Sequence, residues 1–226
     1  MKKRNAVFAV FLLVAGLALA GCGKLGGGAA GSWDTSVNSI HVTRDMEVES
    51  ALVYTSAQQN ELYQPDELAS FVEEAVSAYN QARGAEARGR NEEGLTRLPA
   101  ALKECSLEGS TGKLVFEYGT PGDLVTFSQE TGDNTHTVTA IFVGKAADVA
   151  AEGKLAGISF AKPDGKEATA EEAAKVKNGV AVLVSGSATI CTEGKIAYIS
   201  QGTGELTMKD DHTVVTGEGD HCIVFR

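Results

Sequence analysis

The residues of this chain that could carry chemistry are four cysteines, four histidines and two acidic turns near the C-terminus. Nucleophilic catalysis needs an activated Ser, Thr or Cys, and the chain has no Gly-x-Ser-x-Gly elbow that would expose a serine between a strand and a helix. Zinc sites need ligands at characteristic spacings. The sequence has no Cys-x-x-Cys pattern, and its histidines form no His-x-x-x-His pattern; they are His41, His136, His212 and His221. The sequence therefore predicts no catalytic residue, no metal site and no cofactor.

The two acidic turns, Asp210-Asp211 and Glu218-Gly219-Asp220, come closest to a specific site. Calcium takes about six to eight oxygen ligands, and the alternating carboxylates of an EF-hand loop are absent from the sequence. Acidic residues at hairpin tips commonly form soluble turns that protect sheet edges. We therefore expect soluble turns here rather than a calcium site.

A different chemistry is indicated at Cys22, which follows a segment typical of secretion. Lys2, Lys3 and Arg4 form a positively charged start, residues 6–20 are small or apolar, and Ala20-Gly21 precede the cysteine. A membrane-spanning helix needs roughly 18 or more continuous apolar residues, and this run is shorter and ends in Gly-Cys-Gly. Residues 1–21 are therefore predicted to be a signal peptide.

The stretch Leu19-Ala20-Gly21-Cys22 resembles the lipobox of bacterial lipoproteins, in which the cysteine thiol receives a diacylglycerol and the chain is cleaved in front of it. The resemblance implies that Cys22 is lipidated and that the protein is anchored at the extracytoplasmic face of the cell membrane. Two acyl chains, at about 0.8 kcal/mol per buried methylene, hold a protein stably, whereas one chain holds it only reversibly. The alternative is a secreted protein in which Cys22 is incidental.

The charge balance limits the partners of the mature chain. Removal of residues 1–21 takes away three positive charges and no negative ones, so the formal net charge of −10 becomes −13. Nucleic-acid binding depends on clustered Lys and Arg, and such an acidic chain is therefore not expected to bind nucleic acid. The expected partners are the membrane, through Cys22, and an envelope or extracellular component that the sequence does not identify.

Three cysteines follow Cys22, namely Cys105, Cys191 and Cys222, so at most one intramolecular pair can form among them. Cys191 and Cys222 lie in apparent strands and could be bridged if their Cα atoms were about 4.4–6.8 Å apart. Buried free thiols are the commoner outcome.

The mature chain is predicted to have a tether and one domain. The lipidated Cys22 and a Gly-rich tether occupy residues 22–34, and a single globular domain occupies residues 35–226. Pro65 begins an amphipathic pattern that continues to Arg83. Short helices are predicted after Thr120 and Thr169, because each threonine begins a helix-capping sequence. The remaining alternating segments predict strands, with residues 180–184 as a central strand and an antiparallel meander from residue 195 to the C-terminus. The fold class is therefore α+β, a mainly antiparallel sheet packed by one long amphipathic helix (65–83), with short extra helices.

Several segments together resemble a group of small, uncharacterised lipoproteins of anaerobic Gram-positive bacteria. The matching segments are Ser39-Ile40-His41-Val42, Leu62-Tyr63 with Asp66-Glu67-Leu68 and Tyr79-Asn80, the spacing of Tyr118, Asp123 and Phe127, residues 194–200, and Ile223-Val224-Phe225. These segments cover most of the mature chain, and the resemblance brings no activity with it.

The sequence is thus interpreted as a cell-surface lipoprotein with a non-catalytic binding or structural role at the bacterial envelope. The alternative is an envelope-anchored hydrolase whose carboxylates come together only in three dimensions. A solute-binding protein of a transporter ranks last, because no duplicated βα pattern appears in the sequence.

Overall fold

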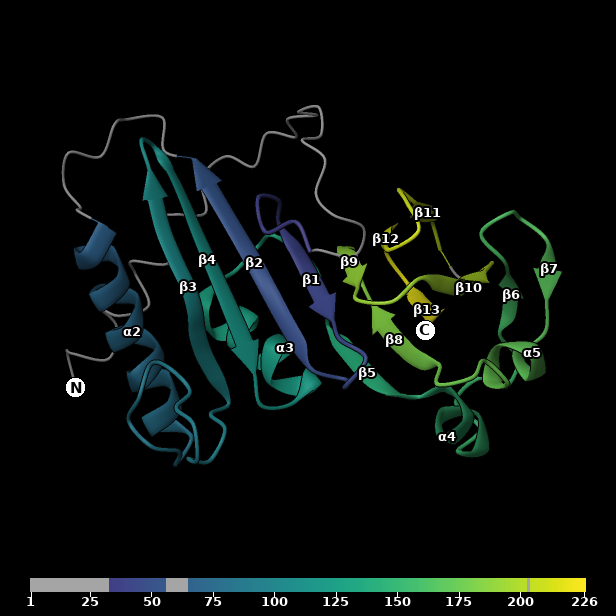
Figure 1. The fold of residues 1–226 in the computed structure, drawn as a ribbon, viewed down its shortest axis with the longest axis horizontal. Coiled ribbons are helices and arrows are strands. Elements are labelled where there is room, and N and C mark those ends of the chain that lie inside the picture. The colour runs from purple at the N-terminus through teal and green to yellow at the C-terminus, as the bar shows by residue number, and fades with distance from the viewer. Residues whose placement is uncertain (1–32, 56–64, 203) are drawn as a thin grey trace. The chain divides into compact units, whose positions relative to one another are not determined.

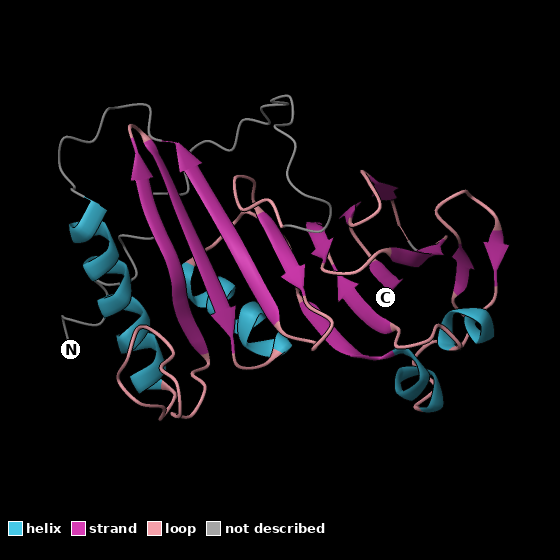
Figure 2. Cartoon of the chain, viewed as in Figure 1, coloured by secondary structure: helices cyan, strands magenta, loops and turns pink. Residues whose placement is uncertain are grey.

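The computed structural model describes residues 33–55, 65–202 and 204–226. The predicted signal peptide, Cys22, residues 22–32 of the tether and the segment Leu62-Tyr63 lie outside the described residues. Within the described part, the chain is a mixed α+β protein with mostly antiparallel strands and few helices, as Figure 2 shows. No helix among these residues is long and apolar enough to cross a membrane.

The chain forms two compact units, which we describe separately. Unit 1 contains Asp34–Asn38 and Val48–Thr135, and unit 2 contains Ser39–Glu47, His136–Arg226 and Trp33. The expectation of a single domain over residues 35–226 stays a prediction.

Unit 1 is a three-stranded antiparallel arrangement in the order β2-β4-β3, with two helices (Figure 1). Its elements are β2 (Val48–Thr55), α2 (Pro65–Ala82), β3 (Ala100–Glu108), β4 (Thr111–Tyr118) and α3 (Pro121–Thr131). Its aromatic core gathers around Phe127 of α3, whose ring centroid lies 5.0 Å from those of Tyr79 and Phe116 and 5.8 Å from that of Tyr118.

The start of α3 follows directly from local sequence. The Thr120 hydroxyl accepts a hydrogen bond from the Asp123 amide, and the Asp123 carboxylate accepts one in return from the Thr120 amide. Pro121 occupies the first turn, where no amide donor is required. Gly132 ends the helix in the left-handed conformation, with φ at 70°. The predicted helix after Thr120 is therefore confirmed.

Helix α2 occupies the predicted segment, but the packing of the fold is shared among several helices. Val72, Ala75, Val76 and Tyr79 of its apolar stripe are buried. Its main contacts are with β3, and Tyr79 also meets Phe127 of α3, whereas α3 contacts β2, β3 and β4. The expected α+β class with mainly antiparallel strands is thus confirmed. The structure does not show the expected arrangement in which one long helix alone packs the sheet.

Unit 2 is built from two groups of paired strands. The first has the order β11-β12-β9-β1, and β1 (Ser39–Val42) pairs with β9 (Ala188–Thr192) in parallel. The other two strands of this group are β11 (Leu206–Met208) and β12 (Thr213–Thr216). The parallel pair joins residues about 150 positions apart, with Ile40 opposite Ile190.

The second group is a six-stranded sheet, with the order β5-β8-β13-β10-β6-β7. Its strands are β5 (Ala140–Lys145), β6 (Ser159–Ala161), β7 (Glu167–Ala168), β8 (Val180–Ser185), β10 (Ile196–Gln201) and β13 (Asp220–Phe225). The predicted central strand at residues 180–184 is confirmed, because β8 lies between β5 and β13. Two short helices, α4 (Ala146–Ala151) and α5 (Ala170–Ala174), pack against one end of this sheet. As predicted, Thr169 caps α5.

The predicted C-terminal meander is confirmed for one hairpin and wrong for the rest. β11 pairs with β12 in antiparallel fashion, but β10 pairs with β6 and β13, so the steps from β10 to β11 and from β12 to β13 each lead to a different group. The physical reason is the burial of β13, in which residues 221–225 are all buried. A strand that is apolar on both faces is stabilised in the middle of a sheet, and β13 accordingly lies between β8 and β10.

Candidate functional site

The strongest candidate site is a cavity of about 370 Å³ in unit 2, on the face of the six-stranded sheet that α4 and α5 leave partly uncovered. Small-molecule sites typically measure ~300–1,000 Å³, so the cavity is at the small end of that range. The lining residues are Ala140, Ile141, Phe142, Lys154, Ile158, Leu183, Val184, Ser185, Ser200, Asp220, His221 and Cys222. We call this the unit 2 cavity.

Strand register divides the face of the sheet into rows. Ala140, Ser185 and Asp220 lie side by side across β5, β8 and β13, and Phe142, Leu183 and Cys222 form the next row. The third row, with Gly144, Ala181 and Val224, is where the helices pack. Because side chains two positions apart share a face, each row lies about 6.7 Å from the next. The face therefore changes from polar at one end to apolar and covered at the other.

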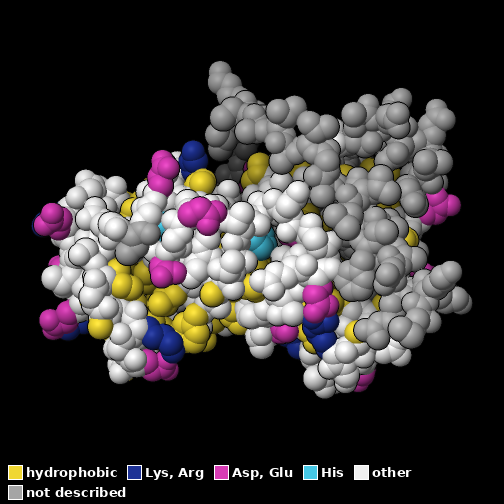
Figure 3. All heavy atoms as spheres, turned by 180° about the vertical axis from the view of Figure 1, so that it is seen from behind, with side chains coloured by type: hydrophobic (Ala, Val, Ile, Leu, Met, Phe, Trp, Pro, Cys, Tyr) yellow, Lys and Arg dark blue, Asp and Glu magenta, His cyan; other side chains and the backbone are white. Residues whose placement is uncertain are grey.

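The apolar floor of the cavity consists of Phe142, Leu183, Cys222 and Ile158. Phe142 is 38% exposed, which is unusual for so large an apolar side chain in this chain. Figure 3 shows a surface of the molecule on which hydrophobic side chains gather beside basic ones. A half-exposed ring that lines a cavity offers a ligand an apolar contact surface.

Gly144 sets how closely α4 approaches this floor. A Cβ atom at position 144 would lie 2.9 Å from Cγ2 of Val149 and 3.2 Å from Cε1 of Phe142. Val149 is buried in the cluster below α4, so it has no open space to move into. The absence of a side chain at Gly144 therefore lets α4 pack closely and leaves room for the Phe142 ring.

Polar side chains surround the floor, among them Ser185, Asp220, Ser200 and Lys154. The Ser185 hydroxyl donates a 2.5 Å hydrogen bond to Oδ1 of Asp220, which orients this carboxylate at the mouth of the cavity. The Ser200 hydroxyl accepts a 2.9 Å hydrogen bond from the Cys222 amide. On the wall, Nζ of Lys154 lies 4.2 Å from the centroid of the Phe142 ring and is also ion-paired with Glu152.

The thiol in the cavity floor is not an activated nucleophile. Burial raises the pKa of Cys222 to about 12, so the neutral thiol is the form present at physiological pH. Since the thiolate is the reactive form of cysteine, Cys222 acts as a small apolar side chain here. The described cysteines, Cys105, Cys191 and Cys222, are free thiols, so the Cys191–Cys222 bridge considered from the sequence does not form.

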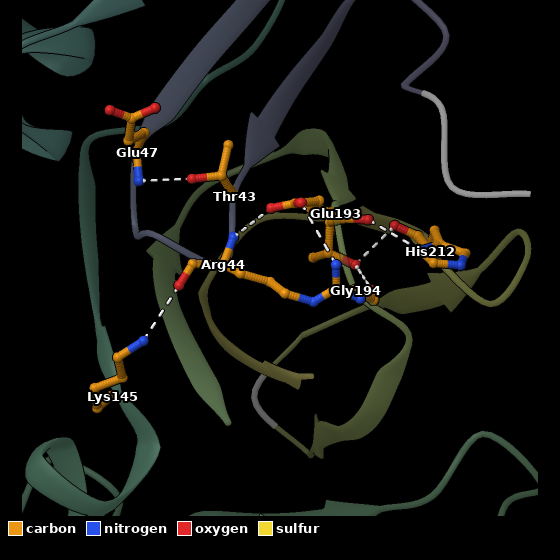
Figure 4. A network of polar contacts seen from close by, with 8 residues as sticks. Thr43, Arg44, Glu47, Lys145, Glu193, Gly194 and His212 are labelled. Carbon is orange, nitrogen blue, oxygen red and sulfur yellow. Dashed lines mark hydrogen bonds and ion pairs between the residues drawn. The ribbon is translucent and has the colours of Figure 1, made fainter. Parts of the chain in front are cut away.

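A second polar cluster in unit 2 joins the turn after β1 to the turn after β9 (Figure 4). The Arg44 amide donates a 2.7 Å hydrogen bond to Oε2 of Glu193. Nη1 of the Arg44 side chain lies 3.4 Å from Oε1 of the same carboxylate. Lys145 donates to the Arg44 carbonyl at 3.2 Å. Thr192 donates to the carbonyls of Gly194 and His212. These contacts satisfy one another at the end of the parallel pair, which makes the cluster a structural junction.

The structure does not bring the histidines together. His41 is buried and stacks on Trp33, with ring centroids 4.7 Å apart. His136 accepts a hydrogen bond from the Val138 amide, while His212 and His221 bond to the carbonyls of Thr192 and Gly217. Within the described ranges, no three His, Cys, Asp or Glu side chains cluster in a way that could hold a metal ion.

The acidic turns have separate local partners. The Asp210 carboxylate accepts a hydrogen bond from the His212 amide, and Asp211 forms a 2.7 Å ion pair with Lys195. The hydrogen bond from Lys195 lowers the pKa of Asp211. Glu218 accepts hydrogen bonds from the Thr137 and Ser187 hydroxyls. Asp220 alone among these acids reaches the unit 2 cavity.

Cys22, the one site residue predicted from the sequence, lies outside the described residues. Sequence reasoning did not find the unit 2 cavity, because its lining comes from four strands and the segment after α4. A partial signal was the acidic turn that ends at Asp220, which the sequence predicted to be a soluble turn rather than a calcium site.

Comparison with protein-family models, curated proteins and solved structures finds no match to this chain. Its function therefore has to be argued from its own residues.

Proposed function

We propose that the chain is a lipid-anchored protein of the extracytoplasmic face of a bacterial cell membrane that binds a small ligand without changing it chemically. The observation that carries the binding role is the unit 2 cavity, in which an apolar floor is bordered by Ser185, Asp220 and Lys154. Concave sites with a mostly apolar lining and a few converging polar groups are the usual form of small-molecule sites.

The anchoring part of the proposal depends on residues 1–22. A charged start, an apolar run and a small-residue end before Cys22 are the features of a lipoprotein signal. A membrane partner through Cys22, and an envelope or extracellular source for the ligand, follow from that location.

The alternative, an envelope hydrolase, has less support at this cavity. Glycoside hydrolysis commonly uses two carboxylates about 5–9.5 Å apart, and Asp220 is the single carboxylate among the described lining residues. The neutral Cys222 thiol also lacks the activation that a nucleophile needs. Both features favour binding over hydrolysis.

Anchoring is tested by expressing the full chain and its Cys22→Ser variant in a bacterium fed an alkynyl fatty acid. We expect the unchanged chain to be labelled and to partition with membranes and detergent, whereas the variant is unlabelled and is either released into the medium or retained uncleaved. Cys105→Ser, which removes a half-buried thiol elsewhere, is the matched control and should behave like the unchanged chain. A Cys22→Ser protein that is still labelled and membrane-bound would exclude lipidation at this residue.

Binding is tested by NMR titration of the 22–226 chain with 3-phenylpropan-1-ol, a neutral amphipathic probe. We expect amide shifts to concentrate at Phe142, Leu183 and Asp220. Ala140→Trp, which adds an indole at the cavity mouth, should abolish them, whereas Thr207→Trp, at an exposed position on β11, should not. Shifts spread over both units, or equal shifts in the two variants, would refute binding in the cavity.

A further inference from the structure

We propose that the unit 2 cavity selects a small amphipathic ammonium compound, one with a single positively charged amino group and a flat or branched apolar body. This inference rests on the proposed binding function and adds the chemical class of the ligand. It is carried by the order of the side-chain rows along the sheet.

The polar row places a carboxylate where the head group of a ligand would lie. Asp220 begins β13 at the mouth of the cavity, and the Ser185 hydroxyl holds its Oδ1 at 2.5 Å. An ionised carboxylate accepts hydrogen bonds and donates none. A group bound at Asp220 therefore has to donate hydrogen bonds, and an ammonium group donates three.

The overall negative charge of the chain also favours a positively charged ligand. The formal net charge is −10 for the whole chain and −13 after the predicted cleavage. A negative protein field raises the local concentration of cations and lowers that of anions. An organic cation therefore gains both long-range attraction and a local acceptor at Asp220. An organic anion would have to pair with Lys154, whose charge is already ion-paired with Glu152.

The second row supplies the place for the apolar body. Phe142, Leu183 and Cys222 lie one row, about 6.7 Å, further from the mouth than Asp220, and Ile158 completes the floor. The α4 and α5 packing closes the far end of the face at the third row. A short spacer between the ammonium group and a ring or branched chain thus matches the distance between the two rows.

Lys154 restricts the ligand to one positive charge. Its ammonium group lies 4.2 Å from the Phe142 ring centroid, so the cation–π position on that ring already holds a cation. A second positive charge at the apolar end of the ligand would meet this group and be repelled. The ligand class is therefore a monoamine rather than a diamine or polyamine.

The test compares three compounds with one skeleton and different head groups: 3-phenylpropylamine, 3-phenylpropionate and 3-phenylpropan-1-ol. Dissociation constants are measured by NMR titration of the 22–226 chain. We expect the amine to bind at least threefold more tightly than the alcohol and the propionate to bind least tightly. Hydrogen bonds to charged groups contribute more than neutral ones, and the exposure of Asp220 reduces that difference.

Two variants separate the role of Asp220 from a general change of charge. Asp220→Asn should weaken amine binding about threefold to tenfold and leave alcohol binding unchanged. Asp164→Asn, which removes the same charge in the exposed turn before Lys166, should leave both unchanged. Circular dichroism spectra of both variants confirm that the fold is retained.

The outcomes distinguish the two proposals. Equal binding of the amine and the alcohol, tighter binding of the propionate, or an unchanged amine affinity in Asp220→Asn would overturn the ligand class while leaving the cavity as a binding site. If none of the three compounds shifted the amides of the lining residues, small-ligand binding itself would be refuted.

Discussion

Asn80, near the end of α2, is a buried polar side chain that connects three segments of unit 1. It is fully buried, its Nδ2 donates to the carbonyls of Arg88 at 2.9 Å and Ala100 at 2.8 Å, and its Oδ1 accepts from the Ala100 amide at 3.2 Å. One side chain thus joins the end of α2 to the following loop and to the first residue of β3.

Replacement of Asn80 by Ala leaves three backbone groups without these partners. A buried donor or acceptor that loses its partner costs about 1–3 kcal/mol, and the part-buried Arg88 carbonyl can recover a bond to water. We therefore expect a loss of roughly 3–5 kcal/mol in the free energy of unfolding. Single domains are commonly stable by only ~5–15 kcal/mol, so this loss is a large fraction of the total.

The measurement is urea unfolding followed by far-ultraviolet circular dichroism. Gln81→Ala is the matched control, because Gln81 is the next residue of the same helix, carries an amide and is exposed. It should change stability by less than about 0.5 kcal/mol. If Asn80→Ala lay within about 1 kcal/mol of that control, the inference that this side chain joins the three segments energetically would be wrong.

Three further predictions concern single positions. Burial raises the pKa of Tyr79 to about 12, and its buried hydroxyl has no hydrogen-bond partner among residues 33–55, 65–202 and 204–226. The folded state thus holds this proton more tightly than the unfolded state, so the contribution of Tyr79 to stability should be constant below about pH 10 and fall towards pH 12. In urea titrations Tyr79→Phe should lessen that fall and cost nothing at pH 7, and an unchanged slope would contradict the cause given. Thr120→Ala should destabilise α3 by about 1 kcal/mol in the same assay, because it removes the hydroxyl that accepts the hydrogen bond of the Asp123 amide. A loss below about 0.3 kcal/mol would show that the cap is not stabilising. Gly144→Ala should cost roughly 1–3 kcal/mol through the contact with Val149. Gly122→Ala should be neutral or stabilising, because its Cβ would meet the Thr120 hydroxyl oxygen at an ordinary contact distance of 3.8 Å, and equal effects of the two variants would show that α4 adjusts freely.

The elements that the sequence predicted correctly are those defined by short-range chemistry. The helices after Thr120 and Thr169 each begin with a side chain that caps the amide three residues later, and both lie where the capping pattern placed them. Likewise, β8 is central because residues 180–184 are apolar on both faces. All the information needed for these elements lies within about ten residues.

The pairings that the sequence did not predict join distant residues. β1 pairs with β9 in parallel, and β10 pairs with β13 rather than with β11. No local pattern in β10 distinguishes these partners, because its alternation of side chains fits any neighbour with an apolar face. The choice is made by which strands have to be buried on both sides, and that is a property of the whole unit.

The unit 2 cavity shows how much chemistry depends on that register. Along β13, Asp220 and Cys222 face the cavity, whereas Ile223 and Phe225 belong to the opposite face. A shift of β13 by one residue would exchange the two sets, removing the carboxylate from the mouth and a small thiol from the floor. Both sets are buried except at Asp220, so the exchange would also bury that charge. The cost of burying it favours the observed register, and so the same carboxylate that the proposed ligand would meet also helps to align the strand that presents it.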